Sequence, residues 1–129
     1  MNLLEKIKSG ELTAIGWGTG EMFKYRKYIH DFDLLFTIDD RKKTDYINDV
    51  KIETPEILEK INQQKHILIA YSVEYLETIY TYCKKYEELI VLPFNSHEFN
   101  ILNNLKNLEA ARNTYIHHGI SYINLKNNA

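Results

Sequence analysis

Short apolar segments alternate along the chain with segments in which apolar residues recur at helical spacing. The apolar segments predict five strands, at about residues 12–17, 34–38, 50–52, 67–70 and 89–92. The second of these is almost continuously apolar, as expected of a parallel strand covered on both faces. Residues 44–49 are polar and are interpreted as a loop. Residues 120–125 could form a sixth strand or an ordered tail.

Helical segments are expected between these strands. The first crossover helix should cover about residues 20–29, because apolar residues recur there at helical spacing. The second should begin at Pro55, with Thr54 as its cap. A third should follow the fourth strand, with Ser72 as its N-cap. A long helix is expected at about residues 100–118.

This alternation of strands and helices is typical of right-handed crossovers and a parallel sheet. We therefore expect residues 1–129 to form a single Rossmann-like nucleotide-binding domain. The expected α/β fold is a doubly wound Rossmann-like parallel sheet of five or six strands, with helices on both faces and strand order 3-2-1-4-5-6 if all six exist. Ligands of such sheets bind beyond the carboxyl ends of the strands where the order reverses, here between the first and fourth strands.

A glycine turn follows the first strand, with glycines at Gly16, Gly18 and Gly20. Glycine permits a sharp turn and close backbone approach, and a following helix directs unpaired N–H groups at the turn. The dinucleotide fingerprint can be aligned from Gly16, which places Glu21 at the third glycine position, or from Gly18. We prefer Gly18, because Trp17 fits as the last residue of the strand. Phe23 then replaces the third glycine, and its bulk is expected to narrow a pyrophosphate site. The turn, including Thr19, therefore indicates phosphate binding more specifically than NAD binding; a tight turn without a ligand is the alternative.

Acidic residues follow the second strand. Asp39 lies about 20 residues after the glycines, the spacing at which an acidic residue binds ribose hydroxyls. A carboxylate suits a vicinal diol because each of its oxygens can accept one O–H. The alternative is that Asp39 and Asp40 cap the following turn. The basic residues 41–43 could contact a phosphate, such as the one that distinguishes NADP, or form a solvated loop.

Further candidates follow the fourth and fifth strands. Tyr71 could stack on a base or sugar, and Ser72 could bind a phosphate or sugar, although it could equally cap a helix. His97 is the histidine placed where a general base would be useful, against the simpler interpretation of a loop residue. The sequence contains no recognisable catalytic triad, Cys/His pair or metal-ligand spacing, so the catalytic residues are unknown and no metal is expected.

Composition narrows the class of protein. The 129 residues are 44% hydrophobic and 26% charged, with a net charge of −2, values ordinary for a globular protein. This balance argues against nucleic-acid binding, which usually requires a basic face. No apolar run is long enough to span a membrane. A single cysteine, Cys83, excludes an internal disulfide and fits a reducing, cytoplasmic location.

Three segments together resemble a bacterial family. They are the glycine turn Ile-Gly-Trp-Gly-Thr-Gly at 15–20, Phe-Thr-Ile-Asp-Asp at 36–40 with basic residues behind it, and Val-Lys-Ile-Glu-Thr-Pro-Glu at 50–56. They resemble the Rossmann-like N-terminal domain of bacterial surface-polysaccharide sugar acetyltransferases and related glycan-pathway proteins. The resemblance covers about residues 1–95.

The resemblance implies a domain that holds a nucleotide sugar, with the turn at Gly18 and Gly20 near the phosphates and Asp39 near the nucleoside. In the acetyltransferases a β-helix of hexapeptide repeats catalyses the reaction and binds acetyl-CoA. No such repeats follow Phe94, so transferase activity does not carry over. The chain could be a stand-alone relative or one domain of a longer protein.

Three hypotheses follow. The first is a nucleotide or nucleotide-sugar binding module in bacterial surface-polysaccharide biosynthesis, non-catalytic alone, which partners a glycan-pathway enzyme or fused domain and could form oligomers. The second is an NAD(P)-dependent oxidoreductase or epimerase domain. The third is a protein-interaction module with a decayed nucleotide site.

Overall fold

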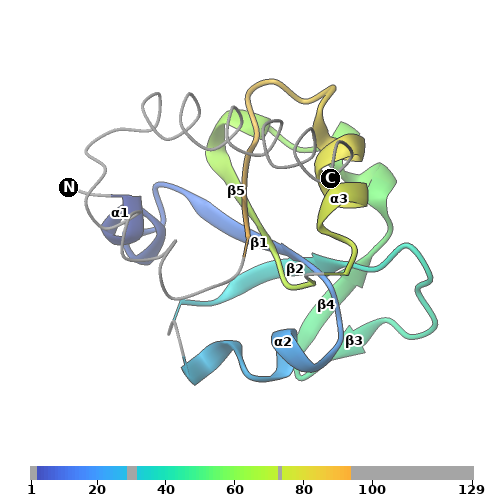
Figure 1. The fold of residues 1–129 in the computed structure, drawn as a ribbon. Coiled ribbons are helices and arrows are strands. Elements are labelled where there is room, and N and C mark those ends of the chain that lie inside the picture. The colour runs from blue at the N-terminus through green and yellow to red at the C-terminus, as the bar shows by residue number, and fades with distance from the viewer. Residues whose placement is uncertain (1–2, 29–31, 73, 94–129) are drawn as a thin grey trace.

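The computed structural model describes residues 3–28, 32–72 and 74–93, which form an α/β fold around a six-stranded sheet (Figure 1). The strands are β1 (Thr13–Trp17), β2 (Leu34–Ile38), β3 (Tyr46–Ile47), β4 (Val50–Glu53), β5 (His66–Ala70) and β6 (Ile90–Pro93). Their order is β3-β4-β2-β1-β5-β6, and all pairs are parallel except β3 with β4. The five predicted strands are thus confirmed, in the predicted order. The predicted helix at 100–118, the segment 120–125 and His97 lie outside the described residues.

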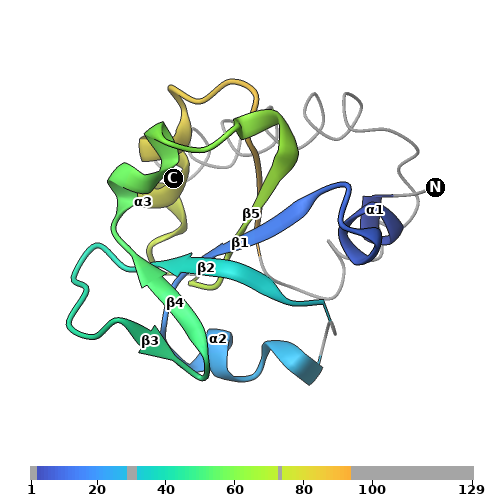
Figure 2. The same ribbon diagram turned by 180° about the vertical axis from the view of Figure 1, so that it is seen from behind.

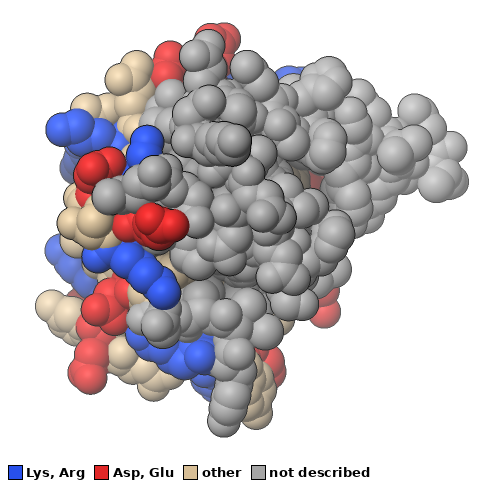
Figure 3. Space-filling view, turned by 90° about the vertical axis from the view of Figure 1, so that its left-hand side faces the viewer, with Lys and Arg blue, Asp and Glu red and all other residues tan. Residues whose placement is uncertain are grey.

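Helical segments connect the strands. The helices are α1 (Leu3–Ser9), α2 (Glu21–Lys24) and α3 (Leu76–Cys83), with 3-10 turns η1 (Arg26–Tyr28), η2 (Pro55–Glu59) and η3 (Gln63–Lys65). Seen from both sides, α1 and α2 lie on one side of the sheet and α3 on the other (Figures 1 and 2). Charged side chains of both signs are interspersed over the described surface in Figure 3.

Apolar side chains alternate between two cores because successive strand residues point to opposite faces. On β1, Ala14 belongs to the core that includes Phe23 of α2, whereas Ile15 and Trp17 belong to the core that includes Ile79 of α3. The central strands are therefore buried on both faces, which accounts for their nearly continuous apolar sequences. The turns after β1, β2 and β5 follow neighbouring parallel strands and therefore lie at the same end of the sheet.

The interpretation of residues 44–49 as a loop is wrong, because Tyr46–Ile47 forms strand β3. Asn48 and Asp49 have φ values of 49° and 65° and connect β3 to β4 as a two-residue hairpin. Positive φ at both central residues is the property of a type I′ turn, whose twist matches that of paired strands. The signal in the sequence was Asn-Asp between the apolar residues Ile47 and Val50.

The first crossover helix is shorter than predicted. Helix α2 ends at Lys24, and after Tyr25 the chain continues as η1. The inward-facing residues are Phe23 and Arg26, whereas Tyr25 is 56% exposed. The Arg26 guanidinium lies 4.0 Å from the centroid of the Phe23 ring, and its Nη1 donates to the Phe23 carbonyl over 2.9 Å. These contacts place Phe23 and Arg26 on the inward face of the segment, in place of the apolar Tyr25 that helical spacing indicated.

Ser72 does not occupy the N-cap of the third helix. Helix α3 begins at Leu76, with Tyr75 as its N-cap. The Ser72 hydroxyl accepts a hydrogen bond from the Tyr75 N–H over 3.3 Å, and so stabilises the turn between β5 and α3. The short side chain satisfies a local backbone donor in the turn itself, and the N-cap lies three residues later than predicted, at Tyr75.

Candidate functional site

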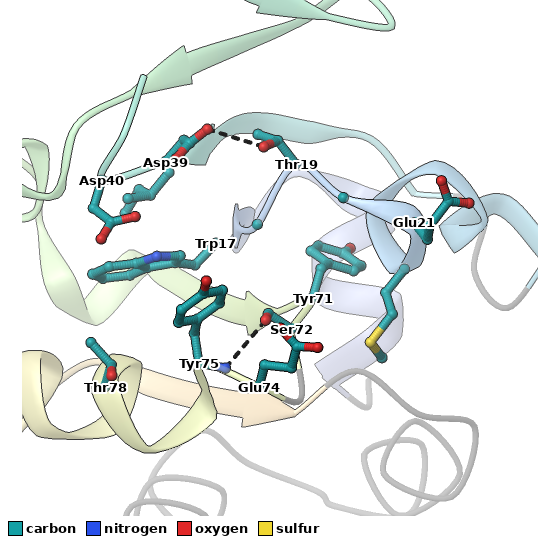
Figure 4. Close-up of a pocket in the computed structure, with 14 residues that line it drawn as sticks. Trp17, Thr19, Glu21, Asp39, Asp40, Tyr71, Ser72, Glu74, Tyr75 and Thr78 are labelled. Atoms are coloured by element: carbon teal, nitrogen blue, oxygen red, sulfur yellow. Dashed lines mark hydrogen bonds between the residues drawn. The ribbon is translucent and has the colours of Figure 1, made fainter. Parts of the chain in front are cut away.

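A cavity of about 460 Å³ opens at the carboxyl ends of β1, β2 and β5 (Figure 4). Strand β1 lies between β2 and β5 in the sheet, so the chain turns away in opposite directions at this point. All seven candidate residues line the cavity: Gly18, Thr19, Gly20, Asp39, Asp40, Tyr71 and Ser72. Residues from three separate turns, predicted one at a time, are therefore brought to one place.

The first two glycines of the turn are required by internal packing. A Cβ on Gly16 would lie 2.9 Å from Thr37 Oγ1 and 3.0 Å from Tyr71 Cε2. Gly18 has a φ of +128°, and a Cβ there would lie 3.2 Å from the Tyr71 carbonyl oxygen. Glycine at these two positions is therefore explained by the approach of the Tyr71 residue to β1.

The backbone of Gly18 is held by β2. Its N–H donates to the Ile38 carbonyl over 2.9 Å, and its carbonyl accepts from the Thr37 hydroxyl over 2.8 Å. The neighbouring Tyr71 N–H donates to the Trp17 carbonyl over 2.8 Å. These bonds fix the start of the glycine turn in one conformation, with the polar backbone groups of Gly18 already bonded to β2.

Gly20 differs from the other two glycines. Its φ is −90°, a value open to any residue, and a Cβ there would have no atom within 4 Å. The residue is exposed and lines the cavity at the start of α2. Neither packing nor backbone conformation within the described residues requires glycine at this position.

Asp39 is half-buried and its carboxylate is oriented by two hydrogen bonds. Thr19 Oγ1 donates to Oδ2 over 3.1 Å, and the Arg41 N–H donates to Oδ1 over 2.9 Å. An ionised carboxylate can accept about four hydrogen bonds, so acceptor capacity remains on both oxygens. The bond from the Arg41 N–H is the turn-capping contact that was the alternative prediction for Asp39. Asp39 makes this contact and also lines the cavity. Asp40 is exposed beside it.

Tyr71 forms part of the cavity lining with very little of its surface, since it is 2% exposed. Its ring packs edge-on against Phe23 with 5.6 Å between ring centroids. Burial raises the pKa of the Tyr71 phenol far above its usual value, so the hydroxyl is neutral at any physiological pH. Phe23 is fully buried behind Tyr71 and is not among the lining residues, so its bulk fills the core rather than the cavity.

Two aromatic residues of the cavity were not predicted. Trp17, the last residue of β1, and Tyr75, in the turn before α3, lie near each other in the cavity (Figure 4). The Trp17 ring is 6% exposed and packs edge-on against Tyr82 at 5.5 Å, whereas Tyr75 is 51% exposed. Only their positions in the sequence could have indicated them. Trp17 ends β1 and Tyr75 follows β5, and these two strands are neighbours at the point where the strand order reverses.

Acidic residues dominate the charge of the cavity. Glu21, Asp39, Asp40 and Glu74 line it, and none of the described lining residues is Lys or Arg. Groups of three or more His, Cys, Asp or Glu side chains placed to hold a metal ion do not occur among the described residues. Hydroxyl and N–H donors are the ligand groups that such a lining accepts most readily.

Comparison with known proteins found no match to the chain among family models, curated proteins or solved structures. In the described part of the chain, the helices are too short and too polar to cross a membrane.

Proposed function

We propose that this protein is a nucleotide or nucleotide-sugar binding module with a doubly wound, Rossmann-like sheet. The observation that carries the proposal is the cavity at the carboxyl ends of β1, β2 and β5, lined by all seven candidate residues. Ligands of open α/β sheets bind in the crevice where the strand order reverses. A volume of about 460 Å³ is within the usual range for small-molecule sites.

Gly20 supports a ligand at this turn. Gly20 is the N-cap of α2, where Ser, Asp or Asn would cap better and without the conformational entropy that glycine loses on folding, so capping does not by itself give a reason for glycine here. Close approach of a ligand to the backbone supplies such a reason, because any Cβ would occupy part of the space. We therefore assign Gly20, rather than Gly18, as the glycine that a ligand contacts.

Asp39 supports a ribose in particular. It follows β2, at the position where an acidic residue binds ribose hydroxyls in dinucleotide-binding folds. Its carboxylate is oriented by donors from different turns, Thr19 Oγ1 to one oxygen and the Arg41 N–H to the other. A carboxylate fixed in this way is ready to accept two hydroxyl groups of a vicinal diol without further ordering.

The sugar and the pathway are proposed from the sequence resemblance to the N-terminal domain of bacterial surface-polysaccharide acetyltransferases. The binding proposal stands on the cavity and does not depend on the pathway. In such a pathway, the module would present a nucleotide sugar to a glycan enzyme encoded with it or fused to it.

Thermal unfolding with a ligand panel tests the proposal. The panel consists of UDP-, GDP-, CDP- and dTDP-sugars, NAD(H), NADP(H), CoA and S-adenosylmethionine. A ligand at 100 times its dissociation constant adds about 2.7 kcal/mol to the free energy of unfolding, which raises the midpoint by several degrees. We expect a shift with a nucleotide sugar and a smaller one in Gly20→Ala. A midpoint unchanged by every compound would overturn the proposal, and a shift with NAD(P) alone would support a dinucleotide enzyme.

A further inference from the structure

A second cavity, of about 470 Å³, adjoins the first. The two share Thr19, Asp39, Asp40 and Tyr75 in their linings, so the turn after β2 forms a wall common to both. The second cavity continues between this turn and the β3–β4 hairpin, where Tyr46, Ile47 and Ile52 line it. A ligand that contacts Asp39 can therefore extend in either direction.

The second cavity contains the positive charge that the first lacks. Arg41 and Lys43 line it, and neither forms an ion pair with another described residue. Lys42, between them in sequence, does not line the cavity and pairs with Asp45 over 3.2 Å. Successive basic side chains of this exposed turn thus point in different directions. Arg41 and Lys43 lie at the cavity, and Lys42 lies at the carboxylate of Asp45.

The charge difference between the cavities bears on where a phosphate can lie. A phosphate in the first cavity would approach Glu21, Asp40 and Glu74 without a neutralising side chain. In the second cavity it could take charge-assisted hydrogen bonds from Arg41 and Lys43. The acidic cavity suits groups that donate hydrogen bonds, such as sugar hydroxyls, amino groups of a base or an amino sugar.

We propose that the two cavities form one binding site, in which the phosphate of a nucleotide lies against Arg41 and Lys43 and its uncharged or cationic end lies in the acidic cavity. This proposal rests on the proposed nucleotide-binding function. Asp39, in the shared wall, holds the ribose between the two ends. The substrate class is a nucleotide whose phosphate lies on the β3–β4 side of Asp39, rather than at the glycine turn.

Nucleoside and nucleotide pairs test this arrangement: uridine with UMP, adenosine with AMP, guanosine with GMP and cytidine with CMP. Binding is measured by calorimetry on the whole chain. For a pair that binds, the proposal expects tighter binding of the nucleotide. The double variant Arg41→Gln/Lys43→Gln should lose about tenfold or more of nucleotide affinity, the usual effect of removing hydrogen bonds from charged groups, with nucleoside affinity unchanged. Lys42→Gln is the matched control and should bind both compounds as the wild type does.

The opposite arrangement has its own signature. If the phosphate lies at the glycine turn, Glu21→Gln/Glu74→Gln will tighten nucleotide binding relative to nucleoside binding, and Arg41→Gln/Lys43→Gln will change neither. That result overturns the two-cavity proposal and leaves the binding module intact. Failure of every nucleoside and nucleotide to bind, together with no effect of the sugar-nucleotide panel, overturns both proposals. All five substituted side chains are exposed, and circular dichroism verifies that each variant is folded.

Discussion

The Thr19 hydroxyl donates a hydrogen bond to Asp39 Oδ2 over 3.1 Å, and this bond joins the glycine turn after β1 to the end of β2. The two residues are 20 positions apart in sequence and lie in the wall shared by both cavities. The bond fixes the direction of one carboxylate oxygen while the Arg41 N–H fixes the other. The Asp39 carboxylate is thus held in one orientation on this wall, as the proposed contact with ribose hydroxyls requires.

The ligand for this test is the nucleotide that shifts the unfolding midpoint. Replacing Asp39 with Asn should reduce the affinity for it about tenfold or more, because one charged acceptor for ribose hydroxyls is lost. Calorimetric titration measures the change. Asp33→Asn removes the same charge from an exposed residue whose partner is Lys27, and should leave the affinity unchanged. Equal affinities for wild type and Asp39→Asn would remove Asp39 from the site.

Gly18→Ala and Gly20→Ala should have opposite consequences. At Gly18 the positive φ and the 3.2 Å contacts with Tyr71 should cost about 1–3 kcal/mol of stability. At Gly20, the N-cap of α2, an alanine should lower the free energy of unfolding by no more than about 1 kcal/mol, because alanine is a poorer N-cap residue than glycine, while weakening ligand binding. Urea unfolding and calorimetry separate the two effects. A large destabilisation by Gly20→Ala would mean that the turn needs glycine for folding, and the argument for a ligand there would fail.

Substitution of Gly18 is for the same reason a poor test of ligand approach. Its N–H and carbonyl are already bonded to β2 and its Cβ position faces Tyr71. Any lost affinity would mix a folding defect with a binding defect. Gly20→Ala avoids this difficulty.

The hairpin turn offers a test of the fold itself. Asp49 has a φ of 65°, and glycine at this position of a type I′ turn is favoured. Asp49→Gly should therefore raise the free energy of unfolding by about 0.5 kcal/mol, since glycine adopts positive φ without a steric cost. Asp45→Gly, at a residue without positive φ, should lower it. Urea unfolding that ranks the two variants in the reverse order would contradict the hairpin.

Sequence patterns predicted the sheet well because the apolar residues that favour a strand locally are also the residues that the two cores bury. Strand β2 is almost continuously apolar and is bounded by polar residues, so its limits were predicted correctly at Leu34–Ile38, although Leu35 within it is exposed. The hairpin was missed because its strand β3 has only two residues, too few to show alternation. The Asn-Asp pair indicated a hairpin turn, but the polar composition of residues 44–49 indicated a loop more strongly.

Tertiary contacts decided what the sequence could not predict in the site. Phe23 of α2 packs against Tyr71 with 5.6 Å between ring centroids, a contact between residues far apart in the chain that local spacing does not reveal. The cavity's aromatic residue Tyr75 follows a turn whose shape is set by the Ser72 hydroxyl. The difference in charge between the two cavities, the first lined by acidic residues alone and the second by Asp39 and Asp40 together with two basic residues, likewise emerges only when the turns after β1, β2 and β5 are assembled.

Cys83 should make stability fall at alkaline pH. Burial raises the pKa of its thiol from 9.0 to about 12. Above pH 9 the unfolded thiol loses its proton while the folded one keeps it, so stability is fully present below pH 9 and decreases as pH rises. Between pH 8 and pH 10 this group should lower the free energy of unfolding by about 1.4 kcal/mol, because pH 10 lies one unit above the pKa of the unfolded thiol. Urea unfolding at both pH values measures it.

Cys83→Ala is the control for this loss. The variant should be less stable at pH 8 because it leaves a cavity, and its further loss between pH 8 and pH 10 should be smaller than that of the wild type. In the native wild-type protein the thiol should react slowly with iodoacetamide at pH 8. Equal slopes with pH in the two proteins, or fast labelling, would show that the thiol is not buried as described.

Fluorescence of Trp17 tests the central claim most directly. Trp17 is the single tryptophan of the chain and lines the first cavity, so its emission reports on that site without a label. We predict a saturable change on titration with a nucleotide or nucleotide sugar, with at least about tenfold weaker binding in Gly20→Ala. An emission spectrum that stays constant up to millimolar concentrations of every nucleotide tested, or equal affinities in wild type and Gly20→Ala, would contradict a nucleotide site at the glycine turn.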